Sequence, residues 1–441
     1  MYLDYMRGLL MVQTMLSGAP TTTRPTVRQA RRRLLSYSPD AITAFISIFG
    51  LTFIPLFGSK GALLFLLGGM AIIATKPGEV LASLRREWPI VLVALWCVMS
   101  FGWSDYTSLT LRYGIQLLLT VIIAVAIAYR LAPMTFIKIV FATSAMGGLA
   151  SLLIGRERSD GLGYLGIHAS KNALADASSV LIIAALAVLV DRRLSARWRL
   201  PALAAMLLGA MLLVMGQSSG ALVSTLIVIL IFGAIILLQR LSPYMRLVAI
   251  ALTIVLSAAI VVLLSSISDQ LARLFLDITG KDITLTGRTD LWAIAFEQIV
   301  EKPLLGVGFQ AFWVPGQPVA EQLWAQFGIT GRSGFHFHNT IVSNAVEIGI
   351  LATIVQVVIF IVAAWACLGW AVRSPSAASV FFALFMVRLF MLMWIEVVYF
   401  YQFSVGTAII IAAICYAHRF REYIYNSALS KIRQPIRIIF R

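Results

Sequence analysis

Gly287-Arg288-Thr289-Asp290-Leu291-Trp292, Lys302-Pro303-Leu304-Leu305-Gly306-Val307-Gly308 and Phe335-His336-Phe337-His338-Asn339 are three motifs of one polar stretch, residues 287–349. The stretch lies between two hydrophobic runs and is the only long polar interruption in the second half of the sequence. Two of the four histidines of the protein lie in it. We therefore expect it to divide a membrane-spanning chain into two sets of helices and to carry the chemistry.

The composition of the chain is that of a membrane protein. Of the 441 residues, 60% are hydrophobic and only 12% are charged, whereas a water-soluble globule needs a far more polar surface. About twelve apolar runs are long enough to cross a hydrocarbon core of roughly 30 Å. They lie near residues 42–58, 61–75, 88–103, 112–130, 134–154, 172–190, 200–215, 219–238, 245–266, 340–370, 376–393 and 398–417. The sequence predicts an all-α polytopic membrane protein with about 12 transmembrane helices.

The net charge of +16 is concentrated between the apolar runs. Basic clusters at 31–33, 85–86, 192–199 and 419–441 fall on one side of the membrane if the N-terminus is cytoplasmic. This distribution follows the positive-inside rule and predicts that both termini are cytoplasmic. Basic loops next to anionic lipid need no nucleic-acid partner, so none is expected.

The apolar runs and the polar stretch predict five parts of the chain. Residues 1–40 form a basic cytoplasmic tail, 41–266 hold transmembrane helices 1–9, and 267–338 form a large helical loop on the outer side. Residues 339–417 hold transmembrane helices 10–12, and 418–441 form a second basic cytoplasmic tail. The three cysteines show no paired or metal-ligand spacing, and no metal or other cofactor is predicted.

A helix with a phosphate-binding start is predicted in the large loop. Thr289 can cap a helix that runs from Asp290 to about residue 300, and Lys302-Pro303 ends it. Arg288 then immediately precedes the helix N-terminus, where a cation and free N–H groups suit a phosphate. The predicted apolar stripe of this helix consists of Leu291, Trp292, Ile294, Ala295 and Ile299.

His338 is the candidate base. Asn339 can cap the helix of the following span, which places His338 at the N-terminal end of that helix. A helix N-terminus disfavours positive charge and so favours the neutral imidazole that can accept a proton. The alternative is that His336 and His338 are interfacial histidines bonded to loop carbonyls. A zinc site is less favoured, because an i, i+2 pair supplies two ligands and spacing marks no third.

A second polar cluster lies on the predicted outer loop of residues 155–171 and the helix start that follows. The cluster contains Arg156, Arg158, His168, Lys171 and Asn172. Free N–H groups at a helix start attract anions, so the cluster is a candidate substrate-binding region. An ordinary solvated loop with a snorkelling lysine is the alternative.

Arg388 lies within an apolar run, near its predicted outer end. A charged residue in a span indicates a functional site, and a pair with Glu396 or snorkelling to the interface is the structural alternative. The sequence lacks a Walker loop, a dinucleotide-binding glycine fingerprint, an Asp-x-Asp motif and an HExxH motif. Nucleotide-driven and metal-driven reactions are therefore disfavoured.

The ordered set of motifs resembles the signature region of the bacterial O-antigen ligase and polymerase superfamily. It comprises residues 287–292, Pro303 to Gly308, His338-Asn339, Glu347-x-Gly349 and the earlier Trp103-Ser104-Asp105. Residues 308–313 and 166–172 are most similar to exopolysaccharide polymerases of the rhizobial type. Trp103 also fits an ordinary interfacial tryptophan.

The resemblance implies a membrane glycosyltransferase of the GT-C kind at the outer, periplasmic face of the bacterial inner membrane. It implies metal-independent, inverting transfer from undecaprenyl-diphosphate-linked glycans, in which Arg288 binds the diphosphate and His338 assists deprotonation of the acceptor hydroxyl. Many members have Ser-Arg-Gly where this chain has Ser218-Ser219-Gly220. Another cation is expected to replace that arginine. The further candidates for binding diphosphate or glycan are Arg388, Lys171, Arg156, Arg158, His168, Asn172, His336, Asn339 and Trp292.

Three functions remain open from the sequence. A polymerase would transfer a growing lipid-linked glycan onto another lipid-linked repeat unit, and an O-antigen ligase would transfer it to lipid A core through the same donor half-reaction. A lipid-linked oligosaccharide flippase or transporter is less favoured, because the polar residues gather on the outer side instead of the midplane. The expected partners are undecaprenyl-diphosphate-linked oligosaccharide and membrane lipid, with a chain-length regulator and export proteins.

Overall fold

The computed structural model describes residues 38–158, 161, 163–242, 244–245, 248, 251–252, 255, 288–332 and 335–432. Most of these residues are helical. The strands among them are the short antiparallel hairpin of β1 (Arg156–Glu157) and β2 (Tyr164–Gly166), a small departure from the predicted all-α fold. The predictions for residues 1–37, for almost all of the run 245–266 and for residues 267–287 and 433–441 lie outside the described residues.

The helices follow the predicted apolar runs. In chain order they are α3 (Pro39–Thr52), α4 (Ile54–Phe57), α5 (Ser59–Thr75), α6 (Pro77–Arg86), α7 (Trp88–Met99), α8 (Thr107–Arg130), α9 (Pro133–Ile154), α10 (Lys171–Val190), α11 (Arg199–Met215), α12 (Ser219–Arg240), α15 (Arg288–Glu301), α16 (Pro318–Gln326), α17 (Thr340–Arg373), α18 (Ala377–Leu392) and α19 (Val405–Ile432), with short 3-10 turns η1 (Ser100–Gly102) and η2 (Ala196–Trp198). The last run was predicted to start at 398, but its helix starts at Val405. Residues 398–404 form a loop instead, in which Phe400 and Phe403 have left-handed backbone.

The chain is a polytopic helical membrane protein. Within the described part of the chain, five helices are long and apolar enough to cross a membrane, namely α8, α9, α10, α17 and the helix Ala196–Met215 that joins η2 to α11. Helices α5 and α6 together form one more candidate, bent by 102°. Helices α3, α7, α12 and α18 are shorter and apolar. The number of spans stays a prediction.

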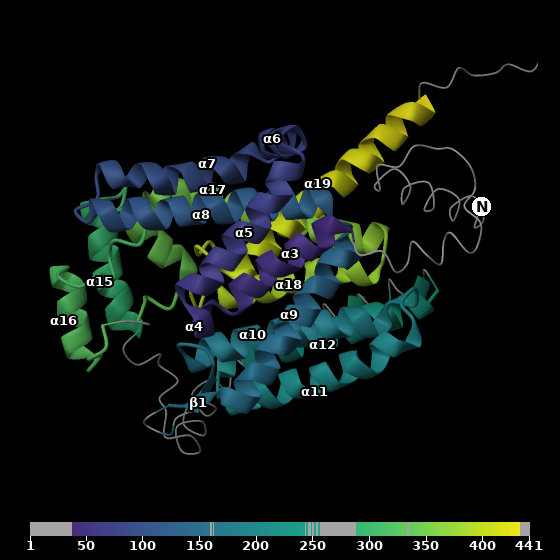
Figure 1. Cartoon of the computed structure of the whole chain (residues 1–441), viewed down its shortest axis with the longest axis horizontal. Coiled ribbons are helices and arrows are strands. Elements are labelled where there is room, and N and C mark those ends of the chain that lie inside the picture. The colour runs from purple at the N-terminus through teal and green to yellow at the C-terminus, as the bar shows by residue number, and fades with distance from the viewer. Residues whose placement is uncertain are drawn as a thin grey trace, which may run out of the picture.

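The helices lie side by side along the long axis of the molecule (Figure 1). Helix α18 lies inside the bundle, where it contacts α10, α12, α17 and α19 and buries most of its residues. Helices α15 and α16 lie at the left end of the view, and α6 lies toward the other end (Figure 1). The described part of the polar stretch therefore covers one end of the bundle.

Helix α17 is broken at Gly349, where φ is 80° and ψ is 165°. A break leaves backbone N–H and C=O groups without helical partners, and in a membrane the protein itself must bond them. The motif segment 303–308 lies along the break and forms hydrogen bonds with these backbone groups. The hydrogen bonds run from Val307 N–H to Val346 O (2.9 Å), from Gly308 N–H to Glu347 O (2.9 Å) and from Ile350 N–H to Pro303 O (2.8 Å).

The motif Trp103-Ser104 holds the segment 303–308 from its other side. Trp103 donates its indole N–H to Leu305 O at 3.0 Å. Ser104 packs against Gly308, where φ is 108° and an added Cβ would lie 2.5 Å from the Ser104 Cβ. Motifs that are about 200 residues apart in the sequence therefore form one packed unit around the break.

Replacement of Gly349 by Ala is expected to destabilise the protein, because an added Cβ would overlap Leu304 O and an L-residue is strained at this φ. Gly233→Ala is the matched control, since Gly233 lies within α12 and a Cβ added there would meet no atom within 4 Å. Thermal unfolding in detergent should show a Tm several degrees lower for Gly349→Ala. The control should equal or slightly exceed the wild type. An unchanged Tm for Gly349→Ala would contradict the role of the break.

Candidate functional site

Side chains from separate segments meet at the carboxylate of Glu396, just after α18. Nη2 of Arg288, the first residue of α15, lies 3.7 Å from Glu396 Oε1. His336 Nε2 lies 3.6 Å and His338 Nδ1 lies 3.4 Å from Glu396 Oε2. Asn172, at the start of α10, donates its amide N–H to Glu396 Oε1 at 2.8 Å. The structure thus brings together residues that the sequence predicted in two distant loops.

The loop that carries the two histidines is fixed at two points, between the histidines and at its junction with α17. Trp292 of α15 donates its indole N–H to Phe337 O at 2.7 Å. The Asn339 side chain accepts two backbone N–H groups of the first turn of α17, which confirms the predicted cap, and its amide donates to Trp394 O at 3.3 Å. The polar atoms of Trp292 and Asn339 thus hold the loop in place, and their predicted contact with a ligand stays a prediction.

Helix α15 confirms the helix predicted in the large loop, with one correction at its start. The helix begins at Arg288, whereas Thr289 was predicted to cap it from outside. The helical backbone already includes Thr289, so this residue lies in the first turn and cannot be the N-cap. Leu291 and Ala295 are buried, as the predicted stripe requires, and Glu301 ends the helix before Lys302.

Charge within the cluster is divided between a neutral imidazole and an anionic carboxylate. Burial is the main cause that lowers the pKa of His336 to about 4. The nearby His338 and Arg288 act in the same direction, and Glu396 opposes them. Burial acts to raise the pKa of Glu396, but the contact with His338 and the interactions with His336 and Arg288 outweigh burial and lower the pKa below its usual value. Near neutral pH the cluster therefore holds an ionised Glu396 next to a neutral His336.

His336, His338 and Glu396 also have the spacing of a metal site, since one ligand atom of each lies within 4.8 Å of the others. The fold supplies the third ligand that sequence spacing did not mark. The donor chemistry favours a different role, however. His336 Nδ1 accepts the backbone N–H of His338 at 3.1 Å, so the neutral ring carries its proton on Nε2. Neither nitrogen is then free for a metal, and Arg288 places a positive charge beside the same carboxylate.

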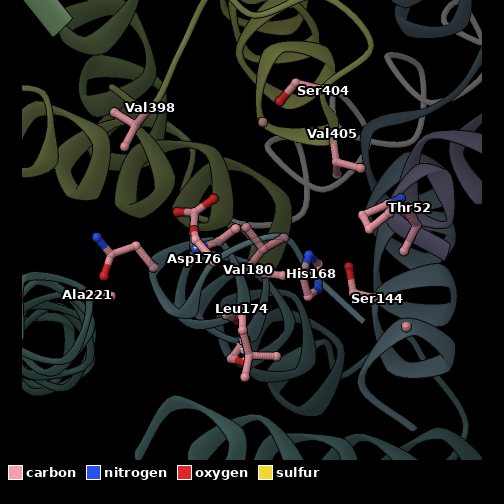
Figure 2. Close-up of a pocket in the computed structure, with 18 of the residues that line it drawn as sticks. Thr52, Ser144, His168, Leu174, Asp176, Val180, Ala221, Val398, Ser404 and Val405 are labelled. Atoms are coloured by element: carbon pink, nitrogen blue, oxygen red, sulfur yellow. Dashed lines mark hydrogen bonds between the residues drawn. The ribbon is translucent and has the colours of Figure 1, made fainter. Parts of the chain in front are cut away.

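A cavity of about 380 Å³ opens beside the cluster. His168, Asn172, Asp176, His336 and Glu396 contribute to its polar lining. The apolar part comes mainly from α3, α9, α10 and the start of α19, and Figure 2 shows Thr52, Ser144, Val180 and Val405 around the same space. A lining of this kind suits a ligand with a polar head and a hydrocarbon part.

Arg388 is fully buried in the cavity wall and pairs with Asp176, Nη1 to Oδ1 at 2.7 Å. The structural alternative named Glu396 as its partner, and this was wrong, because α18 directs Arg388 toward α10 instead. Its Nε and Nη2 have no partner among the described residues. Arg288, whose side chain is 26% exposed, is the more accessible cation of the two.

The remaining candidates differ in position. Arg156 and Arg158 are exposed at the β-hairpin, and neither they nor Lys171 line the cavity. His168 does line it, and burial lowers its pKa to about 4 against the opposing field of Asp176. Arg156, Arg158, Lys171 and Arg388 were the candidates to replace the arginine that is absent from the turn Ser218-Ser219-Gly220. Among these four, Arg388 lines the cavity. Ser218 of the turn lines the same cavity.

Two comparisons with known proteins match this part of the chain. A family model described as O-antigen ligase matches residues 204–357. The exopolysaccharide production protein ExoQ of Rhizobium meliloti (strain 1021) is 32% identical over 323 residues, which are 72% of this chain and 74% of that protein. The chain belongs to the O-antigen ligase and polymerase superfamily. This membership confirms the resemblance inferred from the motifs, including its similarity to the rhizobial exopolysaccharide type.

The family model matches residues 204–357, which contain Arg288, His336 and His338 but not Glu396. Sequence reasoning considered Glu396 only as a partner for Arg388. The available signal was an acid just after the end of an apolar run, where an unpaired carboxylate is costly. Only the fold shows which of the distant cations and imidazoles it meets.

Acidification is expected to destabilise the protein through His168 and His336. Their pKa values are about 4 in the folded state and roughly 6.5 in an unfolded chain. Between these values the unfolded chain binds more protons, so stability falls as the pH decreases from 6.5 toward 4 and is unaffected by these groups above 6.5. The Tm of the wild type should therefore fall between about pH 6.5 and 5, where most carboxylates stay ionised.

The matched test of this pH dependence is the double variant His168→Gln/His336→Gln. Its Tm should vary less with pH over the same interval. Equal slopes for the two proteins would contradict the assignment of buried, neutral histidines.

Proposed function

We propose that this protein is a polysaccharide polymerase of the GT-C type, which transfers a glycan from undecaprenyl diphosphate onto another lipid-linked repeat unit. The observation that carries the proposal is that Arg288 and His338 both contact Glu396, whose carboxylate lines a cavity with polar and apolar walls. Membership in the superfamily and the similarity to an exopolysaccharide production protein support polymerase or ligase activity.

The donor half of the reaction needs a cation next to a hydrophobic binding site. As the bond between the sugar C1 and the diphosphate oxygen breaks, negative charge grows on the departing lipid diphosphate. Arg288 is partly exposed at the cluster and can bind phosphate oxygens in a bidentate manner. In a site with little water its charge stabilises the departing diphosphate more than it would in bulk solvent. The apolar wall of the cavity would contact the start of the prenyl chain.

The acceptor half needs a base. The acceptor hydroxyl oxygen forms a new bond to C1 on the face opposite the leaving group, which inverts the configuration. The hydroxyl proton passes to His338. The products are the new glycoside, the protonated imidazole of His338 and the released lipid diphosphate, which together contain all atoms of the reactants. A positioned base of this kind typically contributes about 10²–10⁴-fold to the rate. Since Arg288 supplies the positive charge, the proposed transfer uses no metal.

The proposed orientation places this site at the outer, periplasmic face of a bacterial inner membrane, with both termini cytoplasmic. The basic clusters of the sequence support it through the positive-inside rule. Helices α15 and α16 and the histidine loop would then form the outer end of the bundle. Access from that side suits acceptors that are already lipid-linked.

A ligase that transfers the glycan to lipid A core is the second candidate, and the description of the matching family favours it. It would use the same donor half-reaction. The identity of the acceptor is the difference, so an assay with separate acceptors distinguishes the two.

Purified protein in liposomes is expected to convert a lipid-diphosphate oligosaccharide into a ladder of longer lipid-linked chains in the presence of a chelator. Arg288→Gln and His338→Gln should each lower turnover by roughly 10²-fold or more, since each removes a group that acts in the transition state. Arg332→Gln is the matched control, because Arg332 lies in the same stretch but is 56% exposed and pairs with Glu321.

Other outcomes of this assay would identify another function. Product that appears only with a lipid A core acceptor would make the protein a ligase. Loss of activity with chelator, restored by a divalent metal, would contradict metal-independent transfer. Movement of the lipid between leaflets without any new glycosidic bond would contradict the enzyme and support a flippase.

A further inference from the structure

Glu396 is the one side chain among the described residues that contacts all the predicted groups of the cluster. Besides Arg288, His336 and His338, it accepts the amide of Asn172. These residues come from two helix starts and a loop, and Glu396 itself follows the deeply buried helix α18. The carboxylate therefore determines where several side chains point relative to one another.

The backbone of Glu396 is held as firmly as its side chain. Its N–H donates to Leu392 O at 2.8 Å, which continues the end of α18. Its carbonyl accepts the hydroxyl of Thr340, the first residue of α17, at 2.7 Å. A functional group whose backbone is hydrogen-bonded to two helices keeps its geometry better than a group on a free loop.

The two nitrogens of His338 have different surroundings. Nδ1 is enclosed, has no hydrogen-bond partner among the described residues and lies 3.4 Å from the Glu396 carboxylate. The side chain as a whole is 21% exposed, so the exposed surface belongs to its other atoms. Nε2 is the nitrogen left for an acceptor hydroxyl. An imidazole can accept a proton at Nε2 only if its own proton is on Nδ1.

We propose that Glu396 is the positioning residue of His338: its carboxylate holds the proton on Nδ1, directs Nε2 toward the acceptor and stabilises the imidazolium that forms on proton transfer. The inference rests on the proposed function, in which His338 is the base. A carboxylate with this relation to a catalytic imidazole fixes both its tautomer and its orientation. The separation of 3.4 Å is longer than a good hydrogen bond, and catalytic contacts of this kind tighten when substrate binds.

A different role for Glu396 would be to anchor Arg288 and Asn172 only. In that case its removal would change donor binding, independently of His338. The two roles therefore predict different kinetics, because a group that acts through His338 has no further effect once His338 is absent.

Glu396→Gln keeps the size of the side chain and removes its charge. We expect kcat to fall by about 10²–10⁴-fold, with KM for the lipid-diphosphate donor changed by less than about threefold. The double variant Glu396→Gln/His338→Gln should be no slower than His338→Gln alone. Glu396→Asp, which keeps the charge on a shorter side chain, should recover part of the activity. Glu297→Gln on the exposed face of α15 is the matched control and should have wild-type kcat.

Multiplied losses in the double variant, or a higher KM with unchanged kcat, would overturn the inference while leaving the polymerase proposal intact. Absence of turnover in the wild type would instead contradict the proposed function. A second measurement then still tests Glu396, because the protein has only four histidines and their ¹⁵N signals can be assigned with single variants. His338 should be the Nδ1–H tautomer in the wild type and lose this preference in Glu396→Gln. An unchanged tautomer in that variant would overturn the inference.

Discussion

Backbone groups inside a membrane find no water to bond, so a break in a spanning helix is stable only if the protein supplies every partner. At the break of α17 at Gly349, the segment 303–308 lies along the helix and exchanges three hydrogen bonds with it. Trp96 donates its indole N–H to Ile348 O at 3.0 Å. Trp103 and Ser104 close the other side. The glycines of these motifs therefore follow from close backbone approach, and the packed unit they form fixes the start of α17.

The position of the candidate site depends on that start. Asn339 caps α17 directly after His338, and the Thr340 hydroxyl donates to the carbonyl of Glu396. These two contacts fix the position of the histidine loop relative to the segment that follows α18. Helix α15 adds Arg288 from the third side. A cation, two imidazoles and a carboxylate can share a small, partly buried space because their charges largely balance, whereas any one of them alone would be costly there.

Local patterns in the sequence predicted the apolar runs, helix α15 with its buried face, and the Asn339 cap, because each depends on residues close together in the chain. The family resemblance assigned Arg288 and His338 to one site, and both approach Glu396 in the structure, although their roles stay proposals. The pairing of Arg388 with Asp176, the loop at 398–404 and the position of Glu396 could not be predicted in this way. Each depends on which helices pack against α18, and spacing in the sequence carries no such information.

The most direct measurement of the central claim is an experimental structure of the protein in a lipid nanodisc with a non-hydrolysable lipid-diphosphate donor. The proposed mechanism predicts diphosphate oxygens within about 3 Å of the Arg288 guanidinium. It also predicts the sugar C1 facing the His338 ring and the prenyl chain in the cavity bordered by α3, α9 and α10. A donor bound elsewhere, with Arg288 still on Glu396 and the cavity empty, would contradict it.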